Sequence, residues 1–276
     1  MSIPSNYLLG QSTYEQERLM LQARFLRPYT DRFFHAAGLR PGMHVLELGS
    51  GVGDVAFLAG DIVGPRGRVL GLDRDPLALD RARQRAVELG CSSWVSFQTT
   101  RLEDFSTTDV FDAVVGRYVL LYQPNPAATL RQMTQFLRPG GIVAFHEVDF
   151  SLREFSYPPC ELADQVAALL PEAFRRMGLP PDFGRRLGRT YLDAGLPFPA
   201  LAAEIPVSGG VGAYGYSLLA STIVSISPRF KELGLSMPSG VAADDTLAAR
   251  LEAALVASGS QAVGTTQFGA WSRKPL

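Results

Sequence analysis

Short apolar runs alternate with amphipathic stretches between residues 44 and 148, and this alternation constrains the fold of the chain most strongly. The runs that we expect to form strands are 45–48, 68–72, 94–98, 111–115 and 141–146. Helical patterns are found at 55–63, 76–89 and 126–137. Strands that alternate with helices are typical of a parallel α/β sheet with right-handed crossovers, so we predict a doubly wound, Rossmann-like sheet.

The regions on either side of this core have a different pattern. Apolar residues recur at helical spacing from residue 19 to 26, and Pro28 is expected to break or kink this helix before a second helical piece that ends at Ala37. After Asp149 the alternation stops. Two further strands, near 202–207 and 262–270, are expected to complete a seven-stranded sheet. Helices are expected near 162–177, 216–233 and 244–257.

Composition excludes several classes of protein. The formal net charge is −1, so no global field attracts nucleic acid or anionic lipid, although a local basic face could be hidden in the total. Two cysteines, Cys91 and Cys160, cannot form a disulfide framework or a multi-cysteine zinc site. The three histidines and the acids have no metal-ligand spacing. No apolar run approaches the roughly 20 residues that span a bilayer, and residues 1–10 lack the features of a signal peptide. We therefore expect a cytoplasmic protein with no metal, membrane or nucleic-acid partner.

Three glycines at alternate positions, Gly49, Gly51 and Gly53, follow the first expected strand and precede a helix. Glycines let the backbone turn sharply and let a ligand approach the main chain, and ligands bind at this edge of such a sheet. A dinucleotide-binding loop places its third glycine five residues after the first, where this chain has Asp54. Because a carboxylate there would also repel a pyrophosphate, nicotinamide and flavin dinucleotides are disfavoured.

Asp73 ends the second expected strand, 20 residues after Gly53. An acid at this position can accept hydrogen bonds from both hydroxyls of a ribose. An isolated acid at a strand end is more often a helix cap or a solvated group. Its distance from the glycine loop favours the ribose role.

Four segments together resemble the class I S-adenosylmethionine-dependent methyltransferases, in particular small-molecule methyltransferases of bacterial specialised metabolism. The segments are Glu47 to Gly53, Asp73, Phe111 to Arg117, and Leu137 to Gly141. The resemblance covers residues 10–150 and is expected to extend to the end of the chain. It implies S-adenosylmethionine as the cofactor and S-adenosylhomocysteine as its product.

The resemblance assigns cofactor roles to individual residues. The backbone from Gly49 to Gly53, including Gly51 and Val52, would hold the methionine amine and the adenosine. Glu47 would orient the loop or reach the amine through water, and the alternative is that it only braces the loop. Asp73 would hold the ribose and Arg74 would stack near the adenine. Gly116 and Arg117 would border the cofactor.

One position departs from the family pattern. The loop after the third strand usually offers an aspartate to the adenine amine, and this chain has Arg101 there. We expect the main chain near Leu102 to hold the adenine, with Glu103 as a second partner.

The resemblance also implies a division of the chain into three segments. Residues 1–42 would form an N-terminal helical lid, residues 43–150 the cofactor-binding core, and residues 151–276 a helical insert and cover with the last strands. From the lid, Tyr7, Tyr14 and Gln22 could approach the methionine carboxylate. The alternatives are helix packing for Tyr14 and solvent exposure for Gln22.

Methyl transfer from a sulfonium requires alignment of the nucleophile and, for many acceptors, removal of a proton. His146, at the end of the fifth expected strand, is the first candidate for the base, and a core histidine is the alternative. Glu147 is the second candidate, although neighbouring strand residues point to opposite faces. Tyr122 is the third.

Aromatic residues after strands four and five suggest an apolar or aromatic acceptor, although several of them must belong to the core. They are Tyr118, Tyr122, Phe150, Phe155, Tyr157, Tyr214 and Tyr216. We expect methyl transfer to a carbon, nitrogen or oxygen of a small metabolite, indole-like or phenolic, by a monomer or homodimer. An RNA or protein methyltransferase, and a non-catalytic cofactor-binding protein, are the alternatives.

Overall fold

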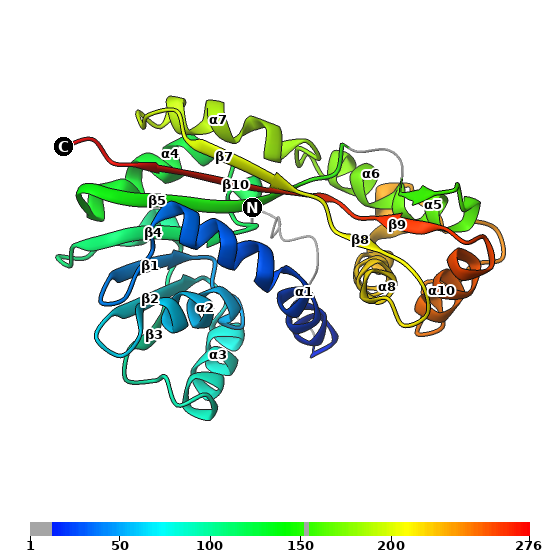
Figure 1. The fold of residues 1–276 in the computed structure, drawn as a ribbon, viewed down its shortest axis with the longest axis horizontal. Helices are drawn as coiled ribbons and strands as arrows, with labels where there is room; N and C mark the ends of the chain where they lie inside the picture. The colour runs from blue at the N-terminus through cyan, green and yellow to red at the C-terminus, as the bar shows by residue number, and fades with distance from the viewer. Residues whose placement is uncertain (1–12, 152–154) are drawn as a thin grey trace. The chain divides into compact units, whose positions relative to one another are not determined.

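The structure is a computed structural model that describes residues 13–151 and 155–276 (Figure 1). The chain divides into two compact units. One, the sheet unit, comprises Leu26–Glu147, Gly184–Ala203 and Phe268–Leu276. The other, the helical unit, comprises the N-terminal residues to Phe25, Val148–Phe183 and Glu204–Gln267. The expected three-segment division stays a prediction, and these units divide the chain at other positions.

The large sheet has seven strands in the order β3-β2-β1-β4-β5-β10-β7. In that order the strands are Val95–Thr99, Arg68–Asp73, His44–Leu48, Phe111–Arg117, Leu137–Asp149, Thr266–Arg273 and Ala200–Glu204. The first five are joined by parallel pairing. This confirms the doubly wound, Rossmann-like α/β fold and its seven-stranded sheet.

Helices accompany this sheet, and the first four along the chain follow the predicted apolar periodicity, whereas the fifth was not predicted from the sequence. They are α1 (Thr13–Ala37), α2 (Asp54–Val63), α3 (Pro76–Glu88), α4 (Pro126–Met133) and α7 (Phe183–Asp193). In Figure 1, α2 and α3 lie beside β1, β2 and β3. One core forms there because Val45, Val69 and Ala113 share a sheet face and pack with Phe34 of α1 and Leu79 of α3.

Helix α1 corrects one prediction, because it continues through Pro28 without a break. Proline removes one backbone donor and crowds the preceding turn, but this does not end the helix here. Burial of Leu26 before the proline and of Phe33 and Phe34 after it, all at most 4% exposed, favours helix on both sides of the proline.

The helical unit holds the remaining helices and a second sheet. The helices are α5 (Glu161–Ala167), α6 (Leu169–Arg176), α8 (Tyr214–Ile226), α9 (Phe230–Leu233) and α10 (Leu247–Ala257). Short strands β6 (Ser156–Tyr157), β9 (Gln261–Val263) and β8 (Val207–Ser208) form a three-stranded antiparallel sheet. The sequence patterns did not predict this sheet. They also merged β9 with β10 into one strand, and α5 with α6 into one helix.

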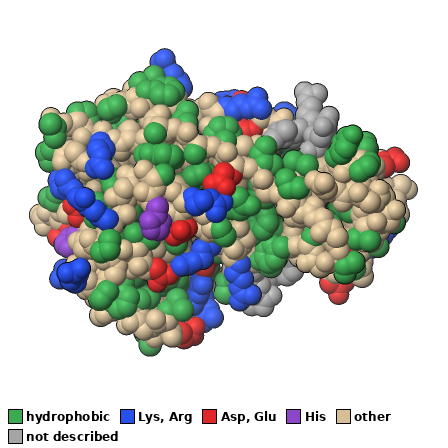
Figure 2. Space-filling view, viewed as in Figure 1, with side chains coloured by type: hydrophobic (Ala, Val, Ile, Leu, Met, Phe, Trp, Pro, Cys, Tyr) green, Lys and Arg blue, Asp and Glu red, His purple; other side chains and the backbone are tan. Residues whose placement is uncertain are grey.

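The described helices include none that is both long and apolar enough to cross a membrane. On the face drawn in Figure 2, basic and acidic side chains lie among one another rather than in a broad patch of one sign.

Candidate functional site

The loop between β1 and α2 is built from glycines in left-handed backbone conformations. The φ angles of Gly49 and Gly51 are +69° and +51°. A Cβ on Gly49 would lie 2.8 Å from Cγ2 of Val119, whereas a Cβ on Gly51 would meet no atom of the described residues within 4 Å. Gly49 is therefore required by close packing, and Gly51 leaves its main chain open to an approaching group.

Asp73 lies against this loop, as the sequence spacing predicts. Its Oδ2 accepts a hydrogen bond from the backbone N–H of Gly51 at 2.8 Å, and its Oδ1 accepts one from the N–H of Asp75 at 2.9 Å. A carboxylate has about four acceptor positions, so roughly two remain for other donors. Burial raises the pKa of Asp73, although the backbone hydrogen bonds oppose this.

The helix-cap alternative for Asp73 is wrong. Asp75 is the N-cap of α3, since its carboxylate accepts from the N–H groups of Leu77 and Ala78 at 3.0 and 3.4 Å. Because Asp75 caps α3, Asp73 does not cap this helix and its carboxylate binds the glycine loop.

Glu47 braces the same loop from inside the sheet. Its side chain is fully buried, and Oε2 accepts a hydrogen bond from the hydroxyl of Ser50. Its Oε1 is buried and makes no hydrogen bond with any part of the chain that the structure describes. Burial and the nearby Asp73 carboxylate raise the pKa of Glu47 well above its ordinary value. A buried oxygen of this kind, on a carboxylate or on a neutral carboxylic acid, is suited to a hydrogen bond with a bound polar ligand.

The carboxylate of Asp54 is not an unbalanced charge at the start of α2. Arg85 pairs with Asp54 at 2.7 Å and also donates to the carbonyl of Val52 at 2.6 Å. The expected repulsion of a pyrophosphate is therefore reduced, while the mismatch in glycine spacing still stands. Val52 itself is buried, and Gly53 begins α2 as its N-cap.

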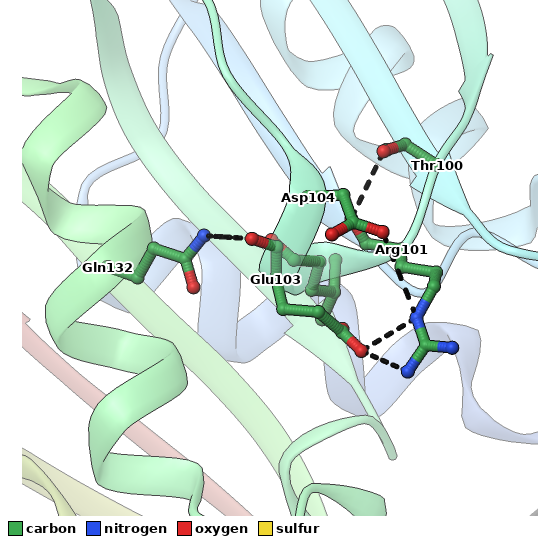
Figure 3. A network of polar contacts seen from close by, with 6 residues as sticks. Thr100, Arg101, Glu103, Asp104 and Gln132 are labelled. Atoms are coloured by element: carbon green, nitrogen blue, oxygen red, sulfur yellow. Dashed lines mark hydrogen bonds and ion pairs between the residues drawn. The ribbon is translucent and has the colours of Figure 1, made fainter.

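The loop after β3 contains a polar network (Figure 3). Arg101 forms hydrogen bonds to Oε1 of Glu103, through Nε at 2.7 Å and through a second guanidinium nitrogen. Gln132 of α4 donates to the carbonyls of Leu102 and Glu103, both at 3.1 Å. Arg101 therefore holds the carboxylate that was expected to face the adenine, and Gln132 holds the loop. The adenine roles of Leu102, Glu103 and the exposed Arg74 stay predictions.

Gly116 and Arg117 end β4, next to β1. A Cβ on Gly116 would lie 2.7 Å from the ring of Phe145 and 2.8 Å from Val119, so packing alone requires glycine here. Arg117 donates to the hydroxyl of Thr30 at 3.2 Å. Whether either residue borders the cofactor stays a prediction.

His146 and Glu147 project to opposite faces of β5, as strand alternation predicts. His146 lies on the face of Ile142 and Ala144, with its Nδ1 2.9 Å from the hydroxyl of Thr30. Glu147 accepts hydrogen bonds from the N–H groups of Val119 and Leu120 at 3.0 and 2.8 Å. Both side chains are fully buried.

Burial raises the pKa of Glu147 to about 8, against the opposing effect of these backbone donors. Glu147 is thus anchored to the turn after β4, which favours a structural role over that of a base. His146 is enclosed by rings, with Phe33 and Tyr118 in edge contacts at centroid distances of 5.1 and 5.5 Å.

Tyr118, one of the aromatic residues that the sequence associates with an acceptor pocket, has an unusual backbone conformation. It is the one described non-glycine residue with a positive φ, +55°, and its N–H donates to the carbonyl of His146 at 2.9 Å. Such conformations are costly for residues with a Cβ and often occur at functional sites. The half-buried Tyr122 follows in a 3₁₀ turn, Leu120–Tyr122.

The expected lid and aromatic residues have mixed outcomes. Gln22 accepts a hydrogen bond from Arg18 at 2.7 Å within the helical unit. Tyr7 and the side chain of Tyr14 lie outside the described residues. Tyr216 is a core residue at 1% exposure, whereas Tyr157 is 71% exposed.

Comparison with known families decides the identity of the region that carries this loop. A family profile described as "Methyltransferase domain" matches residues 39–175. This region is a methyltransferase domain of the class I, S-adenosylmethionine-dependent family. The match to this profile confirms the expected family of the methyltransferase domain and S-adenosylmethionine as its cofactor.

Several relatives of the methyltransferase domain are named as methyltransferases. The chain is 29% identical to the aklanonic acid methyltransferase DauC of Streptomyces sp. (strain C5), over 64% of this chain and 79% of that protein. It is 37% identical to the 2-phytyl-1,4-naphtoquinone methyltransferase of Synechococcus elongatus, over 38% of this chain and 46% of that protein. The chain spans about half the length of the first curated relatives that it matches, 46 to 49%.

A solved structure shares the fold. The [4+2]-cyclase SpnF superimposes with a TM-score of 0.55 at 20% identity, over 91% of this chain and 81% of that one. Its name shows that this fold also carries a reaction other than methyl transfer.

The residues present fit S-adenosylmethionine. Gly51 leaves space beside its main chain, Asp73 keeps acceptor positions for hydroxyl donors, and Glu47 carries a buried oxygen without a described partner. These groups accept from hydroxyls and from an ammonium, which are the donors of the ribose and methionine portions. The residues that the structure describes include no group of three metal-ligating side chains.

Proposed function

We propose that this protein transfers a methyl group from S-adenosylmethionine to a carbon, nitrogen or oxygen atom of a small apolar or aromatic metabolite. The observation that carries the proposal is the contact of the Asp73 carboxylate with the N–H of Gly51 at 2.8 Å, within a methyltransferase domain. This contact holds an acceptor for the ribose at the turn where the family binds its cofactor.

The cofactor supplies an electrophilic methyl group on a sulfonium, whose sulfur leaves as a neutral thioether. The residues of the chain then have separate tasks. Asp73 and the loop from Gly49 to Gly53 bind and orient the cofactor. Glu47 keeps the loop rigid and faces the methionine amine of the cofactor. His146 accepts a proton from the nucleophile. Glu147 holds the turn after β4 through Val119, and Tyr122 on that turn contacts the acceptor.

The class of acceptor is supported by the relatives and by residue chemistry. Two relatives are named for aklanonic acid and for a naphthoquinone. A buried imidazole that acts as a base suits an acceptor whose proton is weakly acidic, such as a phenol or an indole. We therefore propose a phenolic or indole-like acceptor.

Calorimetry with S-adenosylhomocysteine and a methyl-transfer assay against a panel of phenols and indoles, read by mass spectrometry, test the proposal. We expect cofactor binding and a mass gain of one methyl group on at least one acceptor. Binding without transfer to the panel or to RNA and protein substrates would favour a non-catalytic cofactor-binding protein. Transfer to RNA or protein alone would contradict the small-molecule assignment.

A further inference from the structure

The hydroxyl of Thr30 is the meeting point of three polar groups in the sheet unit. It lies 3.1 Å from the carbonyl oxygen of Leu26, 3.2 Å from a guanidinium nitrogen of Arg117 and 2.9 Å from Nδ1 of His146. Thr30 and His146 are both fully buried, at 0% exposure. A buried hydroxyl with three neighbours must distribute one proton and two lone pairs among them.

The chemistry of two neighbours is fixed. A carbonyl can only accept, so the contact with Leu26 uses the single proton of the hydroxyl. A guanidinium can only donate, so the contact with Arg117 uses one lone pair. In this arrangement the second lone pair of the Thr30 oxygen is left for His146, which donates to it through Nδ1–H.

We propose that Thr30 is a positioning residue that holds His146 in the tautomer protonated at Nδ1. In this tautomer the lone pair of the ring is on Nε2, the nitrogen that would accept a proton. Edge contacts with Phe33 and Tyr118 restrain the plane of the ring, so the hydroxyl fixes the proton and the aromatic rings fix the orientation. The use of Nε2 in catalysis rests on the proposed function, but the tautomer does not.

Nitrogen-15 NMR of the histidine ring tests the assignment without any methyl transfer. The chain has three histidines, and loss of one set of signals in His146→Gln assigns those of His146. At a pH where the ring is neutral, we expect Nδ1 to carry the proton and Nε2 to have the shift of an unprotonated nitrogen. An Nε2–H tautomer in the wild type, or a ring that keeps both protons up to the highest pH at which the protein stays folded, overturns the proposal.

Two substitutions separate the hydroxyl from the shape of the side chain. Thr30→Val removes the acceptor at nearly constant volume, and we expect the Nε2–H tautomer to become substantially populated. Thr30→Ser keeps the hydroxyl, and we expect the wild-type ring shifts. Wild-type shifts in a folded Thr30→Val variant overturn the proposal. If that variant does not fold, the wild-type spectrum still decides between the two tautomers. If the wild-type ring is protonated at Nδ1 but the protein transfers no methyl group, the proposed function fails and the inference about Thr30 stands.

Discussion

Asp73 and Gly51 are joined by a hydrogen bond of 2.8 Å from the backbone N–H to the carboxylate, so the end of β2 and the loop after β1 form one structural element. The carboxylate is both a brace for the loop and an acceptor for a ligand. Asp75, two residues later, has the same side chain but caps α3 instead. This pair of aspartates allows the two roles to be separated by experiment.

We expect Asp73→Ala to weaken binding of S-adenosylhomocysteine about 100-fold or more. Hydrogen bonds to a charged group each contribute about 1.5–3 kcal/mol, and two hydroxyl contacts would be lost. Isothermal titration calorimetry measures the change. Asp75→Ala is the matched control, and it should lower stability by about 1 kcal/mol with little change in affinity. Equal affinities of the wild type and Asp73→Ala would contradict the ribose assignment.

We expect His146→Gln to lower turnover by a factor of about 10² to 10⁴, the usual contribution of a positioned base, and to leave cofactor affinity nearly unchanged. Steady-state kinetics with the best acceptor from the panel, together with calorimetry, provide both quantities. The exposed His35 supplies the control, since His35→Gln should have wild-type turnover. Full activity of His146→Gln would show that the histidine only fills the core.

The pKa of Glu147 gives stability a pH dependence of known sign. Its pKa is about 8 in the folded state and ordinarily 4.5, so between these values the folded protein binds more protons than the unfolded chain. The free energy of unfolding should therefore fall as pH rises from about 5 to 8, by at most about 1.4 kcal/mol per pH unit from this group.

Glu147→Gln keeps an oxygen to accept from Val119 and Leu120 and removes the titration. Urea unfolding at pH 5, 6, 7 and 8 should therefore show a shallower loss of stability than in the wild type. The exposed Glu88 provides the comparison, because Glu88→Gln should leave the pH profile in place. Parallel profiles for Glu147→Gln and the wild type would rule out a raised pKa.

The ion pair between Arg85 and Asp54 should stabilise the fold more than the other pairs of α3. Its two side chains are 16% and 17% exposed, and Arg85 also binds the carbonyl of Val52. We expect Arg85→Met to reduce the free energy of unfolding by about 2 kcal/mol, because a partly buried carboxylate loses its partner. Arg81, whose pair with Glu88 is 36% and 60% exposed, is the control. Arg81→Met should cost at most about 1 kcal/mol, and equal losses for both variants would contradict this ranking.

Gly49 and Gly42 test steric closeness separately from backbone strain. Both have positive φ angles, +69° and +85°, but an added Cβ meets Val119 at 2.8 Å only at Gly49. We expect Gly42→Ala to cost about 1 kcal/mol from the backbone alone, and Gly49→Ala to cost more and to weaken cofactor binding. Thermal unfolding and calorimetry compare the two. Equal losses of stability in Gly42→Ala and Gly49→Ala would mean that Val119, in the loop after β4, moves away from the added Cβ without a measurable loss of stability.

The strands of the sheet and the cofactor loop could be predicted from the sequence because their signals are local. Apolar runs marked β1 to β5, and the spacing of Gly53 and Asp73 marked the first crossover. The missed elements depend on distant contacts. Gly188 makes α7 a weak helix by propensity, yet glycine is needed there because Phe198 lies within 2.8 Å of a Cβ built at that position. The three strands of the small sheet have two or three residues each, too few for a period to be detected.

The candidate site was predicted in part for the same reason. Motif positions such as Asp73 are readable in one stretch of chain. The partner of His146 is not, because Thr30 is 116 residues away in the sequence and is an unremarked polar residue within a helix. The pairing of Arg101 with Glu103 could not be predicted either, because the sequence does not show which charged side chains form ion pairs with one another.

Placement of His146 and Glu147 on opposite faces of β5 sets a limit on how this strand can vary. Side chains alternate between the two faces of a strand, so deleting or inserting one residue between Gly141 and His146 would turn the imidazole away from Thr30 and the carboxylate away from the turn after β4. Substitutions in that stretch can be absorbed by repacking, but a change of length cannot. The spacing along this strand is therefore a feature that variants of the protein must keep if both side chains are to retain their neighbours.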